Sequence, residues 1–381
     1  MEHIFRNHNK MGDLRIAVVV LSVTAVTVHA ACNGEMPLQP QPGASESVSI
    51  VVSDPSLGQV ERTFSVHLPL GYSPDNDVET PLWLDFHGFG WDVSGHLLTV
   101  GTLFHAPAMD DVADEDPDGG FIAVHLDGFA EKTSINLLPI STWNVSGTNG
   151  PLGPPCVLPR PEGFESPCFE SCPHACDPQN SCDLSHCYDD VAFARAVVDY
   201  VAENYCLDRK SIHLGGYSMG GFFTYYAASR LNDILASIAP NSGCPLLGFG
   251  DVPLDPPISI IDFHGLNDFL VPYDVDSPGS LGPGPHDSIL TSGQFYYDQN
   301  PVVMSRWVNT LNCNNSSSSY PTDMDGVDGW SCVIWSDCVD GKEVVHCNGL
   351  YGHDYPFRGE NPRYIAGFRI LWDFLKNHRK N

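Results

Sequence analysis

The sequence predicts one α/β domain built on a mostly parallel β-sheet that is flanked by helices. Apolar segments rich in β-branched and aromatic residues alternate with segments of helical apolar spacing through most of the 381 residues. Between 188 and 228 the order is helix, strand, sharp turn and helix, which is typical of parallel strands joined by helical crossovers. We find no internal repeat and no second domain boundary, so we expect a single domain over residues 48–381.

The first thirty residues have the composition of a secretory signal peptide. A basic residue precedes an apolar run over 16–28, and small residues favour cleavage after Ala30. The thirteen cysteines fit the oxidising compartment that secretion implies. We therefore expect a secreted chain with a signal peptide over 1–30 and a flexible leader over 31–47, and lipid attachment at Cys32 is the alternative.

Four strand candidates open the domain. They are β-branched or aromatic and are separated by Asp-Pro, Gly and Pro-Asp-Asn turn signals. The four candidates cover residues 47–52, 62–69, 81–88 and 120–128. The mixed segment over 91–113 leaves room for a helix.

A segment rich in cysteine and proline, residues 147–187, interrupts this pattern and has almost no apolar periodicity. Because it cannot bury enough apolar surface to order itself, we expect disulfides to constrain it. A zinc site that includes His174 and His186 is the alternative, although no C-x2-C pair is present, so no metal is expected. The segment's six cysteines are Cys156, Cys168, Cys172, Cys176, Cys182 and Cys187.

The second half of the chain continues the alternation of helices and strands. Residues 188–205 carry apolar side chains at helical spacing and predict a helix that faces the core. Further strands are expected at 211–217, 234–240, 258–265 and 343–350, further helices at 302–311 and 364–376, and a loop at 272–300.

The segment over 211–221, SIHLGGYSMGG, predicts a strand that turns sharply into a helix, with Ser218 at the turn. Glycines two residues before and after the serine permit the tight backbone. The turn exposes the Ser218 hydroxyl and directs the N-terminus of the helix toward it. This pattern indicates a nucleophilic serine.

A serine nucleophile needs a base and a carboxylate that orients it, and hydrolases built on such sheets place them in the order Ser, acid, His. Asp268 lies three residues beyond the strand that ends at Gly265, and His353 follows the last strand. We predict that Asp268 is the acid and His353 the base. Asp262 and Asp274 are the rival acids, but the first lies inside a strand and the second lies deeper in a loop.

The segment LDFHGFG at 84–90 predicts the donors of an oxyanion hole. Glycines after a strand allow backbone N–H groups to turn inward, so we expect Phe89 N–H and Met219 N–H to be the donors. A plain turn at the end of the strand is the alternative. His87 and His264 each precede a glycine at a strand end, where we expect them to shape the turn by hydrogen bonding.

The net charge of −29, from 47 acidic and 18 basic residues, argues against a nucleic-acid or anionic membrane partner. No stretch after residue 30 is apolar enough to cross a bilayer. N-glycosylation sequons begin at Asn144, Asn314 and Asn315, of which the last two fit a glycosylated loop better.

Seven segments of the chain resemble secreted feruloyl esterases and polyhydroxybutyrate depolymerases. The resemblance spans roughly residues 60–375. In chain order, the segments are PLWLDFHGFG, TWN, DDVAF, CLDRKSIHLGGYSMGG, IAPNSG, IDFHGLNDFLVPY and GLYGHDYP.

This resemblance implies an α/β-hydrolase fold with Ser218, Asp268 and His353 as the catalytic triad and no cofactor. It also implies that Trp143 lies near the substrate cleft and that Cys206 and Cys244 are candidates for a disulfide. Two departures leave the substrate open. The cysteine-rich insertion is long, and Tyr355 stands where the family often has tryptophan. Cys313, Cys332, Cys338 and Cys347 allow three pairings.

The sequence therefore predicts a secreted, monomeric serine carboxylesterase. The first expected substrate is a feruloyl or similar ester on plant or algal polysaccharide. A polyester such as polyhydroxybutyrate and an acetylated xylan are the alternatives, and a non-catalytic binding module on the same scaffold is the alternative of another class.

Overall fold

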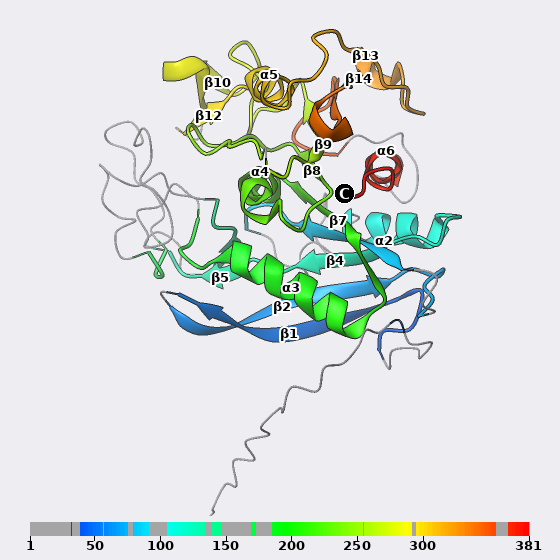
Figure 1. Cartoon of the computed structure of the whole chain (residues 1–381). Helices are drawn as coiled ribbons and strands as arrows, with labels where there is room; N and C mark the ends of the chain where they lie inside the picture. Colours follow the sequence, from blue (N-terminus) through cyan, green and yellow to red (C-terminus); the bar gives the residue numbers. More distant parts are fainter. Residues whose placement is uncertain are drawn as a thin grey trace, which may run out of the picture.

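A ten-stranded sheet organises the part of the chain that the computed structural model describes (Figure 1). This part comprises residue 32 and residues 39–55, 57–74, 79–90, 105–133, 139–145, 169–172, 185–253, 255–291, 295–355 and 365–380. The strand order is β1-β2-β4-β3-β7-β8-β9-β15-β14-β13. In chain order, the strands are β1 (Ala44–Asp54), β2 (Gly58–Leu68), β3 (Thr80–Phe86), β4 (Ile122–Leu126), β7 (Leu207–Tyr217), β8 (Ser237–Asn241), β9 (Ser259–Gly265), β13 (Ser318–Ser319), β14 (Ser331–Trp335) and β15 (Val344–Gly349).

The centre of this sheet is parallel and its two edges are antiparallel. Strands β4, β3, β7, β8, β9 and β15 run in one direction. The long hairpin β1–β2 adds antiparallel to β4 at one edge, and β14 and β13 add antiparallel to β15 at the other. The predicted fold class, a mostly parallel sheet of the α/β-hydrolase type, is confirmed.

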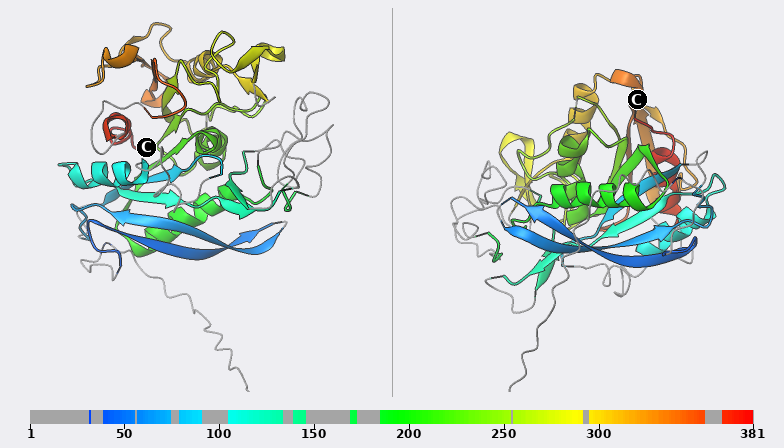
Figure 2. Two further views of the ribbon diagram at one scale, coloured as in Figure 1. Left: turned by 180° about the vertical axis from the view of Figure 1, so that it is seen from behind. Right: turned by 60° about the horizontal axis from the view of Figure 1, so that its bottom comes forward.

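Helices cover both faces of the sheet. The helices are α2 (His105–Glu115), α3 (Asp190–Asn204), α4 (Met219–Leu231), α5 (Asn300–Thr310) and α6 (Ile365–Leu375). Side chains alternate along β3, so Leu82, Leu84 and Phe86 pack on the face with α3 and α4, whereas Trp83 packs against α6 on the other face. Figures 1 and 2 show α4 and α6 on opposite sides of the sheet.

The helices predicted at 188–205, 302–311 and 364–376 correspond to α3, α5 and α6. Residues 272–300, which we expected to be loop, instead contain a three-stranded sheet. Its strands are β10 (Ser280–Pro283), β11 (Ser288–Thr291) and β12 (Tyr296–Asp298), and β5 (Phe129–Glu131) and β6 (Ile140–Thr142) form a separate pair. Strands of three or four residues among glycines and prolines carry too little periodicity to be predicted.

The four cysteines near the C-terminal end of the chain form two disulfides, which resolves the three possible pairings. Cys313 bonds to Cys338, and Cys332 bonds to Cys347 across β14 and β15. Within the cysteine-rich segment, Cys172 bonds to Cys187.

The Cys206–Cys244 disulfide that the resemblance implied is wrong. Cys206 bonds to Cys32, and Cys244 is a buried free thiol. The cause is geometric: Cys206 precedes β7, whereas Cys244 follows the C-terminal end of the parallel strand β8. A strand of the length of β7 spans roughly 30 Å, so the two cysteines lie at opposite ends of the sheet.

Some expectations fall on residues outside the described part. These are the signal peptide over 1–30, most of the leader over 31–47 and most of the insertion over 147–187. The last residues of the expected leader belong to the sheet, because β1 begins at Ala44 rather than near Val48.

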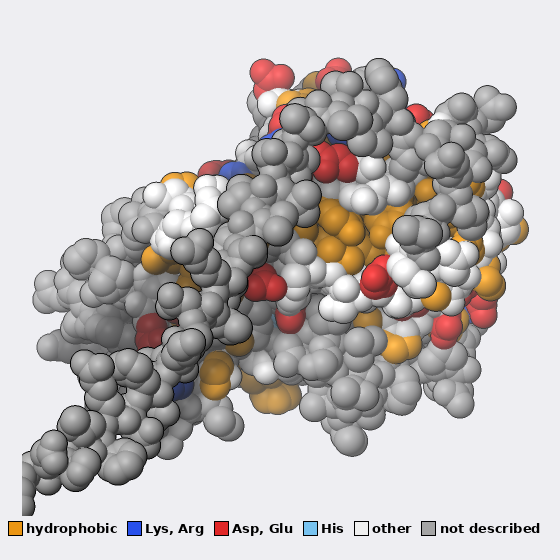
Figure 3. All heavy atoms as spheres, turned by 90° about the horizontal axis from the view of Figure 1, so that it is seen from below, with side chains coloured by type: hydrophobic (Ala, Val, Ile, Leu, Met, Phe, Trp, Pro, Cys, Tyr) orange, Lys and Arg blue, Asp and Glu red, His pale blue; other side chains and the backbone are white. Residues whose placement is uncertain are grey.

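Acidic residues outnumber basic ones in the chain, 47 to 18. Figure 3 shows them spread over one face with few basic side chains between them, in keeping with the charge of −29. Within the described ranges, no helix is both long and apolar enough to cross a membrane.

Candidate active site

Ser218 lies at the sharp turn between β7 and α4, as predicted. Its backbone has φ 55° and ψ −117°. Non-glycine residues rarely adopt a positive φ, and such strained backbone is associated with functional turns. Both flanking glycines are required by contact. A Cβ on Gly216 would meet the backbone of Gly220, and a Cβ on Gly220 would collide with the carbonyl oxygen of Phe86 in β3.

The structure brings Ser218, His353 and Asp268 together in one hydrogen-bonded chain. His353 Nε2 lies 2.8 Å from Ser218 Oγ, and His353 Nδ1 lies 2.7 Å from Asp268 Oδ2. The other oxygen of the fully buried Asp268 carboxylate accepts the N–H groups of Leu270 and Val271, at 2.9 and 2.8 Å. Because a carboxylate accepts from His353 Nδ1–H, Nε2 presents its lone pair to the serine hydroxyl.

The two rival carboxylates have other partners. Asp262 is fully buried in β9 and accepts a hydrogen bond from the Tyr225 hydroxyl. Asp274 accepts from Ser277 in its own turn. The expected order of serine, acid and histidine along the chain therefore identified Asp268 as the carboxylate that contacts His353.

Several hydrogen bonds hold the His353 loop beside the turn at Ser218. The Tyr217 hydroxyl donates to the His353 carbonyl at 2.7 Å, and Ser242 Oγ donates to the Asp354 carbonyl at 3.1 Å. Asn267 N–H donates to the Tyr351 carbonyl at 3.0 Å, so the loops that carry the acid and the base are joined directly. The supporting roles of Tyr217 and Ser242 could not be predicted, because these bonds join residues more than a hundred positions apart.

The loop after β3 approaches Ser218 closely, as an oxyanion hole requires. A Cβ on Gly88 would lie 3.5 Å from Ser218 Cβ, so the glycine permits the approach. Met219 is the first residue of α4, and the first N–H groups of a helix have no acceptor within it. Phe89 follows Gly88 and Met219 follows Ser218, so both residues adjoin the turn, and their role as oxyanion donors stays a prediction.

His87 shapes this loop, as expected. Its Nδ1 lies 2.8 Å from the Gly88 carbonyl, and its Nε2 accepts Gly128 N–H at 2.9 Å. The two partners assign the Nδ1–H tautomer to the neutral ring.

Trp143 lies beneath the 84–90 loop, which adjoins Ser218, rather than at an exposed surface. Its side chain is fully buried, packs edge-on against Phe86, and donates its indole N–H to the His87 carbonyl at 2.8 Å. A side chain without exposed surface has none to offer a substrate, so Trp143 supports the 84–90 loop from beneath. The sequence could not show this, because burial depends on the packing of α4 against β3.

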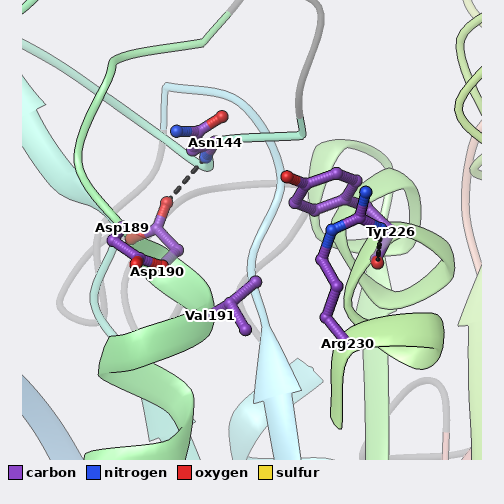
Figure 4. Close-up of a pocket in the computed structure, with 6 residues that line it drawn as sticks. All are labelled: Asn144, Asp189, Asp190, Val191, Tyr226 and Arg230. Atoms are coloured by element: carbon purple, nitrogen blue, oxygen red, sulfur yellow. Dashed lines mark hydrogen bonds between the residues drawn. The ribbon is translucent and has the colours of Figure 1, made fainter. Parts of the chain in front are cut away.

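A cavity of about 200 Å³ lies between the start of α3 and α4, and its lining includes none of Ser218, Asp268 and His353 (Figure 4). Asp190 there accepts Asn144 N–H at 2.6 Å and pairs with the buried Arg62. Asn144 is itself buried and donates its side-chain amide to Tyr188, which disfavours glycosylation at this sequon. The Arg230 guanidinium lies 3.6 Å from the Tyr226 ring on the opposite side.

Within the described ranges, no group of three or more His, Cys, Asp and Glu side chains is placed to hold a metal ion. Of the candidate zinc ligands, Cys172 and Cys187 are bonded to each other. His186 bonds to the Thr142 carbonyl, and burial lowers the pKa of its ring.

Comparison with known proteins finds sequence similarity to esterases. A search of family models finds no match. The chain is 36% identical over 188 residues to the bifunctional acetylxylan esterase/xylanase XynS20E of Neocallimastix patriciarum. This match covers 49% of this chain and 23% of that protein. It is 33% identical over 193 residues to feruloyl esterase B of Piromyces equi, covering 49% of this chain and 31% of the relative. A probable feruloyl esterase C of Aspergillus niger is 35% identical over 171 residues, and this match covers 44% of this chain and 50% of the relative.

The chain thus spans between about a quarter and a half of the length of these relatives. Two solved structures are similar at low scores. An acetyl xylan esterase from Aspergillus awamori has a TM-score of 0.44 at 12% identity, covering 85% of this chain and 99% of the other. A feruloyl esterase module from Clostridium thermocellum has a TM-score of 0.41 at 14% identity, and the match covers 90% of this chain and 93% of the other. Similarities of this size add nothing to the fold derived above.

Proposed function

We propose that this chain is a secreted, monomeric serine carboxylesterase that cleaves feruloyl or similar esters on plant or algal polysaccharide. The observation that carries the proposal is the hydrogen-bonded chain from Ser218 through His353 to Asp268. This arrangement can activate a hydroxyl for attack on a carbonyl carbon, and the reaction needs no cofactor. Relatives named feruloyl esterase and acetylxylan esterase support the substrate class.

In the proposed reaction, Ser218 Oγ attacks the ester carbonyl while His353 Nε2 takes the hydroxyl proton. Negative charge moves to the carbonyl oxygen, where Phe89 N–H and Met219 N–H would donate hydrogen bonds. When the carbonyl re-forms, the alcohol leaves with the proton from His353. Water then attacks the acyl-enzyme with His353 as base again, which releases the acid and restores Ser218.

Asp268 has an orienting role in this reaction. Its carboxylate holds the imidazole in the Nδ1–H tautomer and stabilises the imidazolium that forms during each proton transfer. Two backbone N–H groups hold the carboxylate in place, so it does not depend on solvent.

Exposed apolar side chains in the loops that carry Asp268 and His353 favour an apolar acyl group. Phe269 and Leu270 follow Asp268 directly and are 57% and 50% exposed, and Leu350, three residues before His353, is 59% exposed. Exposed large apolar side chains mark a binding surface where they form a patch. The same surface would suit a polyester, which makes polyhydroxybutyrate the second candidate.

The first experiment measures hydrolysis of a chromogenic short-chain ester. We expect Ser218→Ala to abolish turnover and Ser49→Ala, an exposed serine on β1, to leave it unchanged. Absence of turnover by the wild type, or equal turnover by Ser218→Ala, would contradict the proposal and favour a binding module.

A substrate panel then separates the ester classes. We expect kcat/KM for methyl ferulate to exceed that for hydroxybutyrate oligomers and for acetylated xylan. A preference for the oligomers would replace the first substrate class with the polyester. N-terminal sequencing of the protein from culture medium tests secretion and cleavage after Ala30, and light scattering tests the monomer.

A further inference from the structure

A buried carboxylate that the proposed reaction does not use lies behind the triad. Asp262 on β9 is fully buried and accepts hydrogen bonds from three elements. Tyr225 of α4 donates its hydroxyl at 2.5 Å, Asn300 of α5 donates its amide at 2.9 Å, and His346 Nδ1 of β15 lies at 3.0 Å. Burying a charge is unfavourable unless several donors compensate it, so this cluster requires an explanation.

One of the three donors connects Asp262 to another buried side chain. The amide nitrogen of Asn300 lies 2.9 Å from Asp262 Oδ2 and 3.3 Å from His264 Nδ1. An amide group has two hydrogens, so it can serve both acceptors at once. Asn300 and His264 are both fully buried, which excludes competition from solvent.

The bond to Asp262 determines the orientation of Asn300. A carboxylate only accepts hydrogen bonds, so Asn300 must turn its nitrogen, and not its oxygen, toward Asp262 and His264. His264 Nδ1 then accepts, and the neutral ring carries its proton on Nε2. That proton points to the Val271 carbonyl, which lies 2.8 Å from Nε2.

Val271 belongs to the turn that holds Asp268. Its N–H donates to Asp268 Oδ1 at 2.8 Å, while its carbonyl is held by His264. His264 Nε2 also lies 3.7 Å from Asp268 Oδ2, the oxygen that contacts His353. If Asn300 presented its oxygen instead, His264 would carry its proton on Nδ1, and a lone pair would face the Val271 carbonyl.

We propose that Asn300 and His264 are positioning residues that hold the carboxylate of Asp268 toward His353, and that Asp262 fixes their orientation. The inference rests on the proposed function for its kinetic readout only. Its structural content is a prediction about the bond between His353 and Asp268, which can be measured without turnover.

The kinetic experiment compares a variant of Asn300, which links Asp262 to His264, with a variant of Tyr273, which bonds to His346 instead. In Asn300→Leu, we expect kcat to fall about 10- to 100-fold with KM within about threefold, because a small misplacement of the acid misdirects the base. The acid limb of kcat/KM should move to lower pH by roughly half a unit or more, because a displaced carboxylate stabilises the imidazolium of His353 less.

Tyr273→Phe is the matched control. Its hydroxyl lies 3.2 Å from His346 Nε2, in the same cluster but outside the path from Asp262 to Asp268. We expect this variant to lower the melting temperature without moving the pH profile. If Asn300→Leu and His264→Leu fold and only their melting temperatures change, the proposal is overturned.

His264 offers a rescue test that does not depend on the folding of Asn300→Leu. His264→Gln retains a donor for the Val271 carbonyl, whereas His264→Leu does not. We expect kcat of the glutamine variant to lie within about fivefold of the wild type and that of the leucine variant to fall at least as far as in Asn300→Leu. Equal kcat in the two His264 variants would contradict the role.

Nuclear magnetic resonance separates this inference from the proposed function. The proton on His353 Nδ1 in its bond to Asp268 should give a low-field resonance in the wild type and in Tyr273→Phe, and should be lost or shifted in Asn300→Leu. An unchanged resonance in Asn300→Leu refutes the inference even if the chain hydrolyses no ester. A lost resonance supports it independently of turnover.

Discussion

The Tyr217 hydroxyl ties the residue before Ser218 to the residue that would act as its base, because it donates a hydrogen bond to the His353 carbonyl. We expect Tyr217→Phe to lower kcat/KM about 5- to 10-fold, because one hydrogen bond of about 1 kcal/mol holds the His353 carbonyl. Steady-state kinetics on a chromogenic ester measures the loss.

Tyr351→Phe is the control for this prediction. The Tyr351 hydroxyl is buried near the same loop and has no hydrogen-bond partner among the described residues. Removing it should leave kcat/KM within about twofold. Equal losses in the two variants would show that packing, and not the bond to His353, is responsible.

At the scale of single residues, the sequence predicted which three side chains lie in one hydrogen-bonded chain, but not the residues that support them. Ser218, Asp268 and His353 could be found because each follows a strand in a fixed order. The role of Trp143 could not be found, because its burial depends on contacts with Phe86 and Phe223 from other elements. The bridge through Asn300 was invisible for the same reason.

The turn between β7 and α4 depends on its contact with β3 as much as on its own glycines. We expect Gly220→Ala to lower the free energy of unfolding by about 1 to 3 kcal/mol and kcat about 100-fold, because its Cβ would displace the Phe86 carbonyl and with it the 84–90 loop. Chemical denaturation and kinetics measure the two effects.

Gly352→Ala serves as the comparison. A Cβ there would meet only the Asn267 carbonyl oxygen at 3.8 Å, an ordinary contact, although Gly352 adjoins His353. This variant should retain stability within about 1 kcal/mol. A loss as large as that of Gly220→Ala would mean that the contact with β3 is not the cause.

The Cys332–Cys347 disulfide stabilises the strand pair that leads to His353. We expect the double Cys→Ala variant to have a free energy of unfolding about 3 kcal/mol lower than the wild type, because the bond closes a loop of 15 residues in the unfolded chain. Thermal and chemical unfolding measure the change.

The Cys172–Cys187 disulfide has the same sequence separation of 15 and provides a matched comparison. If restriction of the unfolded chain is the main effect, its double variant should lose a similar amount. A loss confined to the β14–β15 pair would indicate instead that the native strands need the bond.

At the scale of elements, long periodic segments were predictable and short ones were not. Helices α3, α5 and α6 and the central strands were found because each buries a continuous apolar face. The strands β10 to β12 were missed because their pairing arises from contacts between residues rich in glycine and proline. The bond between Cys206 and Cys32 was missed because Cys32 lies outside the segment that the resemblance covered.

For the whole molecule, buried neutral histidines predict a loss of stability in acid. Burial lowers the pKa of His213 to about 3, and the nearby His378 adds to the effect. The unfolded chain therefore binds a proton near pH 6.5 that the folded chain excludes. Stability should be full above that pH and should fall by up to about 1.4 kcal/mol per pH unit as the pH drops toward 3.

Denaturation curves between pH 7 and 4 test this prediction. His213→Gln removes the titrating group, so its stability should fall less steeply with acid than that of the wild type, whatever its stability at pH 7. Parallel curves for the two proteins would exclude His213 as a source of the acid sensitivity.

The disulfide between Cys32 and Cys206 sets an order of events during biosynthesis. A chain leaves the ribosome from its N-terminus, so the native bond of Cys32 cannot form until a partner 174 positions later has been made. The six cysteines of the 147–187 segment emerge before that partner. Once the oxidising compartment has joined two of them, the Cys32 thiolate can attack that disulfide, bond to one sulfur and release the other as a thiolate. We expect the native bond to require a disulfide isomerase, and a host without one to accumulate misbridged chains.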